Sequence, residues 1–269
     1  MTDRYAVIGN PIAHSKSPEI HAAFARATGE DLEYTRILAP LDGFAAAVAA
    51  FRAAGGRGLN VTLPFKGEAC RLATELSDRA RAVEAVNTLR FDRTRILGDT
   101  TDGVGLVRDI GALGFAIEGR RVLLVGAGGA SRSVIPALLE ARPAALLVVN
   151  RTVERAVELE RQFGAQVQAA GFTALPRRAF DIVINATSAG HAGELPPVER
   201  SLFAPGALAY DMTYGKGAAP FLALAREAGA AHVADGLGML VEQAAESFFI
   251  WRGVRPDTAP VLAMLRAAA

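Results

Sequence analysis

Short aliphatic runs alternate with helical patterns through the first hundred residues of the chain. Runs rich in aliphatic and β-branched side chains predict strands over residues 5–9, 32–38, 58–63 and 85–91. Between these runs, helices are predicted over 17–28 and 43–54, and Ile20, Phe24 and Ala27 share one face of the first. Because strands that alternate with helices are typical of βαβ units, we expect a mostly parallel sheet covered by helices.

The same alternation resumes at Arg121 and continues almost to the end of the chain. Strands are predicted over 121–125, 145–150, 181–185, 207–211 and 232–234, with helices over 131–141 and 153–163. This pattern is typical of a doubly wound, Rossmann-type sheet. A last helix over 238–251 has one apolar side, and we expect the C-terminal helices to return to the first domain. The prediction is therefore an α/β protein of two domains, residues 1–101 with 238–269 and residues 102–237.

Composition narrows the class of protein. A length of 269 residues favours two domains, and a net charge of +1 without a basic stripe argues against a nucleic-acid partner. Cys70 is the only cysteine, so no intramolecular disulfide forms, which fits a reducing compartment. The first residues lack the pattern of a signal peptide, and no uncharged apolar run reaches roughly 18 residues. We expect a soluble, cytoplasmic protein without a membrane partner.

A glycine-rich turn follows the strand predicted over 121–125. The residues are Gly126, Ala127, Gly128, Gly129 and Ala130, and a helix follows. Such a turn lets the backbone approach a pyrophosphate at the start of a helix. Ser131 stands where the dinucleotide motif has its third glycine, so the turn alone leaves another nucleotide or a plain tight turn open.

The end of the next strand sharpens this interpretation. An NAD site usually places an acid there to bind the ribose hydroxyl, but this chain has Asn150, Arg151, Thr152 and Arg155. Guanidinium groups bind a 2′-phosphate that a carboxylate would repel, so we predict NADP rather than NAD. Alternatively, Thr152 caps a helix and the arginines form a solvated face, which is compatible with phosphate binding. The polar turn over 186–190 is a weaker candidate contact.

Polar side chains also gather at the predicted strand ends of the first domain. Each has an ordinary explanation: Ser17 and Asp102 fit helix N-caps, and Lys66 fits a surface lysine. Asn60, Thr62 and Pro64 would share one face of a strand, where buried polar groups need partners. Several such clusters together indicate a ligand rich in hydroxyl groups. The residues concerned are Ser15, Lys16, Ser17, Asn60, Thr62, Lys66, Asn87 and Asp102.

Taken together, the motifs of the chain resemble those of the shikimate dehydrogenase family along nearly its whole length. The motifs are GNPIAHSKSP, NVTLPFK, AVNTL, GDTTDG, GAGGASR, NRT, NATS, YDMTYGKG and DGLGMLVEQAA. The resemblance implies reversible, NADP-dependent reduction of 3-dehydroshikimate to shikimate, a step of aromatic amino acid biosynthesis. It also implies that residues 1–101 with 238–269 bind the substrate and that residues 102–237 bind NADP.

The resemblance further implies roles for single residues. Lys66 would be the acid–base residue, hydrogen-bonded to or close to Asp102. The implied substrate contacts are Ser15, Lys16, Ser17, Asn60, Thr62, Asn87, Asp102, Tyr214 and Gln243. The implied cofactor contacts are Asp78, Gly126, Ala127, Gly128, Gly129, Ala130, Asn150, Arg151, Thr152, Arg155, Thr187, Met212, Gly236 and Met239.

Other functions stay open at this point. A quinate/shikimate dehydrogenase that uses NAD would need an acid near Asn150, and a non-catalytic NADP-binding sensor would have lost Lys66 or Asp102. A folate dehydrogenase of similar shape would not need the paired serines. We expect no metal, because one cysteine and four dispersed histidines show no ligand spacing. His21 and His191 are expected to be surface or loop groups. The chain is expected to be a monomer or a homodimer.

Overall fold

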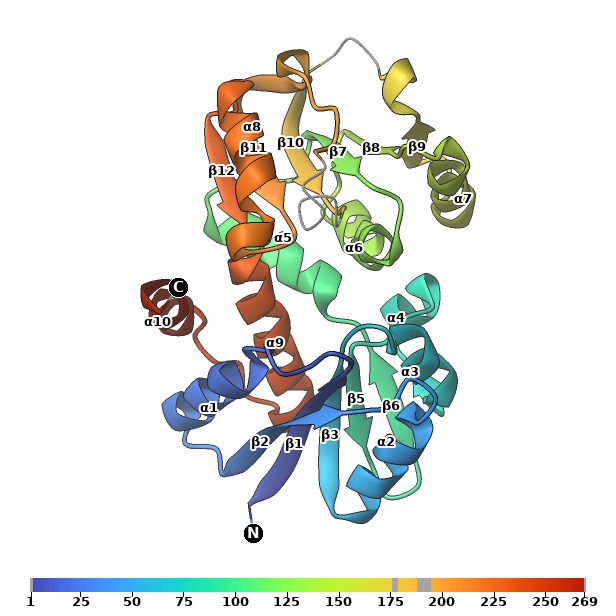
Figure 1. Cartoon of the computed structure of the whole chain (residues 1–269), viewed down its shortest axis with the longest axis vertical. Helices are drawn as coiled ribbons and strands as arrows, with labels where there is room; N and C mark the ends of the chain where they lie inside the picture. Colours follow the sequence, from blue (N-terminus) through green and yellow to red (C-terminus); the bar gives the residue numbers. More distant parts are fainter. Residues whose placement is uncertain (1, 176–178, 188–194, 269) are drawn as a thin grey trace. The chain divides into compact units, whose positions relative to one another are not determined.

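The computed structural model describes residues 2–175, 179–187 and 195–268 (Figure 1). The chain divides into two compact units, Met1–Gly105 with Val241–Ala269, and Leu106–Leu240. The boundaries fall inside the helices α5 (Asp102–Ala112) and α9 (Leu237–Arg252). The last part of α9 and all of α10 (Ala259–Ala267) belong to the first unit, so the C-terminal helices return to it as predicted.

The first unit contains a six-stranded sheet in the order β2-β1-β3-β5-β6-β4. Its strands are β1 (Asp3–Gly9), β2 (Leu32–Leu38), β3 (Gly56–Val61), β4 (Glu75–Leu76), β5 (Thr88–Phe91) and β6 (Ile96–Asp99). Only β5 runs antiparallel to its neighbours β3 and β6, and the other pairings are parallel. The sheet is therefore mixed but mostly parallel, in agreement with the sequence.

Helices cover both faces of this sheet. The remaining helices of the unit are α1 (Ser17–Thr28), α2 (Phe44–Ala53), α3 (Lys66–Leu72) and α4 (Asp78–Val83). Residues of α2, α3 and α4 form one hydrophobic core with the sheet, which includes Phe44, Leu59 and Phe65. Phe24 of α1 packs edge-on against Phe248 of α9, and α10 lies against α1 (Figure 1).

One local prediction in this unit and one alternative, the capping role of Ser17, are wrong. The strand β3 ends at Val61, and Phe65 N–H donates to Thr62 O in the turn that leads into α3, so Asn60, Thr62 and Pro64 do not share a strand face. Ser17 is the first residue of α1 and Lys16 precedes it as the N-cap residue, so Ser17 does not cap the helix. Short elements such as β4, β6, α3 and α4 escaped prediction because they contain too few residues to show a period.

His21 corrects another expectation, since it is fully buried rather than on the surface. Its ring stacks on Tyr34 with the centroids 4.2 Å apart, and Phe24, Phe248 and Trp251 surround it. Neither ring nitrogen has a hydrogen-bond partner among the residues that the structure describes. Burial disfavours the charged ring and lowers the pKa of His21 to about 3, although the neighbouring Asn60 acts in the opposite direction.

The second unit contains a parallel six-stranded sheet in the order β12-β11-β10-β7-β8-β9. Its strands are β7 (Arg121–Val125), β8 (Ala145–Val149), β9 (Val167–Ala170), β10 (Phe180–Asn185), β11 (Phe203–Asp211) and β12 (His232–Asp235). This is the doubly wound Rossmann order, which reverses between β7 and β10. The Rossmann-type prediction is confirmed, although β9 was not predicted.

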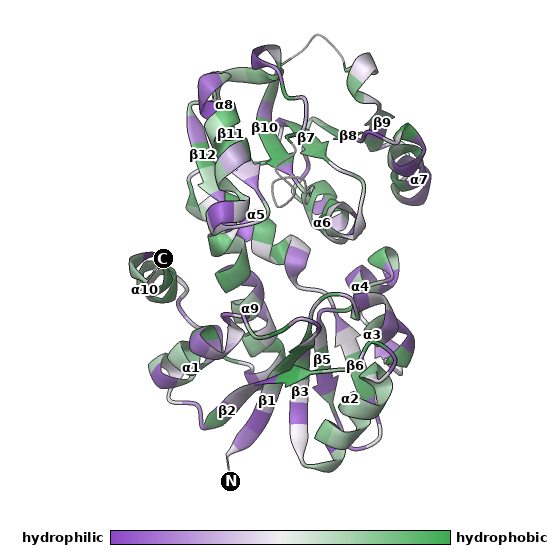
Figure 2. Ribbon diagram, viewed as in Figure 1, coloured by the Kyte–Doolittle hydropathy of each residue, from purple (hydrophilic) through white to green (hydrophobic). Residues whose placement is uncertain are grey.

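Alternation along the strands builds two cores in this unit. Leu124 faces a core formed with α5, α6 (Gly129–Glu140) and α7 (Val153–Phe163), whereas Leu123 faces a core formed with α8 (Ala219–Glu227). Figure 2 shows hydrophobic residues along β7 and β10 and mostly hydrophilic residues on α7. Short 3₁₀ turns complete the described elements at Phe172–Ala174, Arg200–Leu202 and Gly215–Gly217. Among all described helices, none has the length and apolar character needed to cross a membrane.

The buried His21 predicts a dependence of stability on pH. The unfolded chain takes up a proton near the ordinary histidine pKa, whereas folded His21, with a pKa of about 3, does not. The stability that neutral His21 contributes is therefore complete above about pH 6.5 and is lost as the pH falls toward about 3. At about pH 5 the loss should be about 2 kcal/mol.

Urea unfolding of the wild type and of His21→Phe at about pH 7.5 and about pH 5 checks this prediction. Phenylalanine keeps the ring stack but cannot take up a proton, so the variant should lose about 2 kcal/mol less than the wild type between the two pH values. An equal loss in both proteins would contradict the role given to His21.

Candidate active site

Lys66 and Asp102 form an ion pair in the first unit. Lys66 is the first residue of α3 and Asp102 the first residue of α5, and Lys66 Nζ lies 2.6 Å from Asp102 Oδ2. The lysine side chain is 29% exposed and the aspartate side chain 11%, so the pair is within reach of a ligand but largely shielded from water. The position of Asp102 at the start of a helix favours its negative charge. The structure therefore brings the two predicted catalytic residues together.

Asn87 fixes the carboxylate of Asp102 from the side opposite Lys66. The Asn87 amide is buried, and Nδ2 donates to Asp102 Oδ1 at 2.8 Å and to Thr101 Oγ1 at 2.9 Å. Its Oδ1 accepts from the Thr101 backbone N–H and from the Thr88 hydroxyl, both at 2.9 Å. Gln243 Oε1 lies 3.3 Å from Asn87 Nδ2. The predicted residues Asn87, Asp102 and Gln243 thus belong to one hydrogen-bonded network.

Asn60 joins the same network through residues that the sequence did not single out. Asn60 Oδ1 accepts from the Tyr34 hydroxyl at 2.7 Å, and Nδ2 donates to Ser247 Oγ at 3.0 Å. Ser247 Oγ lies 2.8 Å from Thr88 Oγ1. Thr88 adjoins Asn87 in its motif, and Ser247 follows Gln243 by one helical turn on α9, so these positions had a weak signal in the sequence.

The paired serines lie together before α1. Ser15 Oγ donates to Ser17 Oγ at 3.2 Å and accepts from the Ser17 backbone N–H at 3.3 Å, and Lys16 between them is half-buried. Thr62 is also half-buried, and its methyl group fills the space beside Gly9, where an added Cβ would lie 2.5 Å from Thr62 Cγ2. These residues form a polar loop region in the first unit.

Two predicted contacts belong to a different unit from the residues with which they were grouped. Tyr214 is half-buried and belongs to the second unit, whereas the other predicted substrate contacts belong to the first. Asp78 belongs to the first unit, whereas the other predicted cofactor contacts belong to the second. The Asp78 side chain is fully exposed and pairs with Arg81 at 2.8 Å, one helical turn away.

The glycine-rich turn of the second unit has the geometry that a phosphate group needs. Gly126 has φ +106°, and a Cβ there would lie 2.9 Å from Thr187 Cγ2. Gly128 and Gly129 are exposed at the start of α6, and apart from their chain neighbours and their own helix no described residue lies within 4 Å of the place where a Cβ would lie. Ser131, at the position of the third glycine, donates to Gly126 O at 2.7 Å, and this hydrogen bond stabilises the turn. The start of the helix is therefore accessible to an anion.

The end of β8 has no carboxylate of its own. Asn150 follows the strand and its Nδ2 donates to Thr152 O at 2.8 Å. Thr152 precedes α7 but its side chain makes no capping hydrogen bond. Arg151, Thr152 and Arg155 are all exposed. Two guanidinium groups near an accessible strand end fit a phosphate on the ribose of a dinucleotide.

A buried amide–carboxylate pair orders the turns after β10 and β11. Asn185 Nδ2 donates to Asp211 Oδ2 at 2.7 Å, and both side chains are buried. Asn185 Oδ1 accepts from the Thr187 hydroxyl at 2.8 Å, and Asp211 Oδ1 accepts from the Thr213 hydroxyl at 2.7 Å. The predicted contact Thr187 is therefore held in place. Residues 188–190, which complete the predicted polar turn, and His191 lie outside the described residues.

The two remaining cofactor candidates near this turn differ in accessibility. A Cβ at Gly236 would lie 2.3 Å from Met212 O, so only glycine allows this close approach. Met239 is buried in the hydrophobic core of the unit, and Met212 packs against that core while staying partly exposed. Met212 is thus the more accessible of the two methionines.

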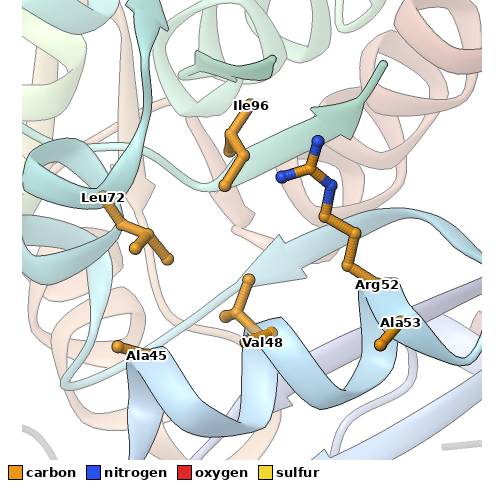
Figure 3. Close-up of a pocket in the computed structure, with 7 residues that line it drawn as sticks. Ala45, Val48, Arg52, Ala53, Leu72 and Ile96 are labelled. Carbon is orange, nitrogen blue, oxygen red and sulfur yellow. The ribbon is translucent and has the colours of Figure 1, made fainter. Parts of the chain in front are cut away.

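An apolar hollow on the first unit offers no comparable chemistry. It has a volume of about 420 Å³ and is lined by residues of α2 with Leu72 and Ile96 (Figure 3). Arg52 is the one charged residue in its lining, and its guanidinium donates to the backbone oxygens of Asp92 and Arg93. The lining includes none of the predicted site residues.

Comparison with known proteins places this geometry in a family. Three family models match the chain: the shikimate dehydrogenase substrate binding domain over residues 7–89, shikimate / quinate 5-dehydrogenase over 110–193, and the shikimate 5′-dehydrogenase C-terminal domain over 236–266. The shikimate dehydrogenase (NADP(+)) of Nitrosospira multiformis is 59% identical, with 100% of this chain and 98% of that protein covered. The chain belongs to the shikimate dehydrogenase family.

Other members support the same placement. The shikimate dehydrogenase (NADP(+)) of Dechloromonas aromatica is 60% identical, covering 99% of this chain and 98% of that protein. The crystal structure of shikimate 5-dehydrogenase from Thermus thermophilus, in complex with NADP(H) and shikimate, matches with a TM-score of 0.86 and 32% identity over 100% of both chains. The family resemblance inferred from the motifs is confirmed.

The tight approach at Gly126 gives a testable prediction about stability. Gly126→Ala should lower the free energy of unfolding by about 1–3 kcal/mol, because an alanine there has an unfavourable φ and meets Thr187. Gly128→Ala is the matched control, since that residue has neither a positive φ nor a close neighbour, and should change the value by less than about 0.5 kcal/mol. Urea unfolding measures both, and equal effects would argue against the strained turn.

Proposed function

We propose that the protein is an NADP-dependent shikimate dehydrogenase that reversibly reduces 3-dehydroshikimate to shikimate. The ion pair of Lys66 and Asp102, fixed by Asn87, is the observation that carries this proposal. The names of the relatives from Nitrosospira multiformis and Dechloromonas aromatica support it, as do the ligands of the Thermus thermophilus structure.

In this proposal residues 1–101 with 238–269 bind the substrate. The neighbouring hydroxyls of Ser15 and Ser17 suit a carboxylate, which accepts hydrogen bonds. Lys16, Asn60, Thr62, Asn87 and Gln243 are the further contacts that we assign in this part of the chain. Tyr214, in the second unit, stays a predicted substrate contact.

Residues 102–237 bind NADP in this proposal. The cradle at Gly126, which an added Cβ would fill, and the open start of α6 fit the pyrophosphate. Arg151 and Arg155 fit the 2′-phosphate, and the absence of a carboxylate at the end of β8 among the described residues agrees with this assignment. The turns at Thr187, Met212 and Gly236 would hold the nicotinamide end, and bound NADPH supplies the hydride.

Lys66 transfers the proton that accompanies the hydride. During reduction, negative charge grows on the carbonyl oxygen, and Lys66 donates a proton to it. During oxidation, Lys66 accepts the proton of the alcohol. Asp102 holds the ammonium group at 2.6 Å, and Asn87 prevents the carboxylate from turning away. Because the Lys66 side chain is 29% exposed, water can return its proton after reduction and remove the proton after oxidation.

The alternatives are weaker on specific grounds. A non-catalytic sensor would not need Lys66 and Asp102, yet both are present and paired. Use of NAD is disfavoured by the two arginines after β8. Quinate is worth testing, because one matching family model is described as shikimate / quinate 5-dehydrogenase.

Steady-state oxidation of shikimate and of quinate, each with NADP and with NAD, tests the proposed function. The proposal requires shikimate with NADP to give the highest kcat/KM.

Replacing Lys66 should remove the proton donor and acceptor. Lys66→Met should lower kcat about 10²- to 10⁴-fold with little change in the KM for shikimate. Lys216→Met is the control, because Lys216 is exposed and distant in sequence from the pair, and it should keep wild-type turnover. Comparable turnover in Lys66→Met would remove Lys66 from the mechanism.

Replacing Arg151 should weaken recognition of the 2′-phosphate. Arg151→Ala should raise the KM for NADP about tenfold or more and leave the KM for NAD nearly unchanged, since NAD lacks that phosphate. Arg161→Ala, at the other end of α7, is the control and should change neither value. Equal increases for both cofactors would refute the phosphate assignment.

A further inference from the structure

The side-chain amide of Asn60 is held at both ends by polar groups from other elements. Tyr34 of β2 donates to Asn60 Oδ1 at 2.7 Å. On the other side, Asn60 Nδ2 lies 3.0 Å from Ser247 Oγ, 3.2 Å from Asn87 O and 3.3 Å from Thr88 Oγ1, which all accept. Because Tyr34 faces the oxygen and the acceptors face the nitrogen, only one orientation of this buried amide satisfies all its neighbours.

The hydrogen-bonding capacity of Asn60 is used unevenly. Its two N–H groups have three acceptors within reach, so the donor side is saturated. A carbonyl oxygen accepts two hydrogen bonds, but Asn60 Oδ1 accepts one among the described residues, from Tyr34. The remaining capacity of Asn60 is therefore that of an acceptor, which suits a ligand hydroxyl.

Ser247 is the point at which several elements of the site meet. It is fully buried on α9, and its hydroxyl donates to Gln243 O at 3.0 Å. Ser247 Oγ also lies 2.8 Å from Thr88 Oγ1 and 3.3 Å from Thr101 Oγ1. It thereby connects β3, β5, the start of α5 and α9 through one oxygen atom.

Tyr34 is equally well fixed. Its ring stacks on the buried His21, with the two planes 6° apart. Burial raises the pKa of Tyr34 well above its ordinary value, although nearby Ser17 and Arg36 act in the opposite direction. The phenol therefore stays protonated, in agreement with its position as the donor to Asn60 Oδ1.

We propose that Tyr34 and Ser247 are positioning residues that turn the amide of Asn60 so that its oxygen accepts a hydrogen bond from a ring hydroxyl of the substrate. Neither residue needs to touch the substrate, since both contact Asn60. Tyr34 also lies beside Ser17, and Ser247 beside Thr88 and Thr101, so the test must isolate the part of the effect that passes through Asn60. This inference rests on the proposed function, because it assigns the substrate hydroxyl to that site. It adds the direction of the hydrogen bond and the two residues that impose it.

Tyr34→Phe and Ser247→Ala test the proposal, because each removes one hydroxyl and leaves a shape that fits the site. Each variant should raise the KM for shikimate about three- to tenfold, which corresponds to one neutral hydrogen bond, with smaller changes in kcat and none in the KM for NADP. Ser133→Ala is the matched control. Its buried hydroxyl donates to the Ala130 backbone oxygen at 2.8 Å, with no second partner in the described part of the chain, and removing it should leave all three constants unchanged.

Analogues of shikimate that keep the hydroxyl to be oxidised and lack one of the other ring hydroxyls separate positioning from a general structural effect. For the analogue that lacks the hydroxyl bound by Asn60, most of the increase in KM should disappear in both variants, whereas for the other analogue the full increase should persist. The same increase for every analogue, or no increase for shikimate, would overturn the proposal. Wild-type protein that does not oxidise shikimate with NADP would instead overturn the proposed function, and this inference with it.

Discussion

The side-chain amide of Asn87 is the constraint on which the site of the first unit depends. Its nitrogen donates to Asp102 and Thr101, and its oxygen accepts from Thr101 and Thr88, so both ends are used. Leaving such a buried group without partners costs about 1–3 kcal/mol. The hydrogen bonds of Asn87 therefore hold the residues before β5 against the start of α5. Because Asp102 is the first residue of that helix, the same bonds set both the helix start and the direction of the carboxylate that pairs with Lys66.

Ion pairs hold the segment that leads to Asp102, while a neutral amide orients the Asp102 carboxylate itself. Arg79 binds both oxygens of Asp99, at 2.7 and 2.8 Å, and also contacts the buried Glu246 of α9. Asp99 accepts in turn from the Thr100 backbone N–H, at the start of the segment that leads to Asp102. Asp102, by contrast, accepts from the neutral amide of Asn87, which orients the carboxylate without adding a second charge that would compete with Lys66.

In the second unit, close backbone approaches at glycine residues shape the strand ends. Gly126 allows β7 to approach the turn after β10 closely, and Gly236 allows an equally close approach to Met212 O. The buried pair of Asn185 and Asp211 then holds the two neighbouring strand ends in register. A phosphate binds to backbone N–H groups in open space, whereas a polyol binds to side-chain donors and acceptors, so the proposed function assigns a different kind of residue to each unit.

The sequence by itself determined the alternation of strands and helices, the Rossmann-type unit and the residues with reactive groups, because periodicity and short motifs are local properties. Lys66, Asp102 and Asn87 stood out in this way. Only the tertiary structure decided the reversed direction of β5, the burial of His21 and the parts played by Tyr34 and Ser247. Asn60 and Ser247 are 187 residues apart in the chain, and a hydroxyl binds whichever partner the fold brings within about 3 Å. Local pattern fixes which face is buried, but the partners of a buried polar group depend on which distant elements pack there.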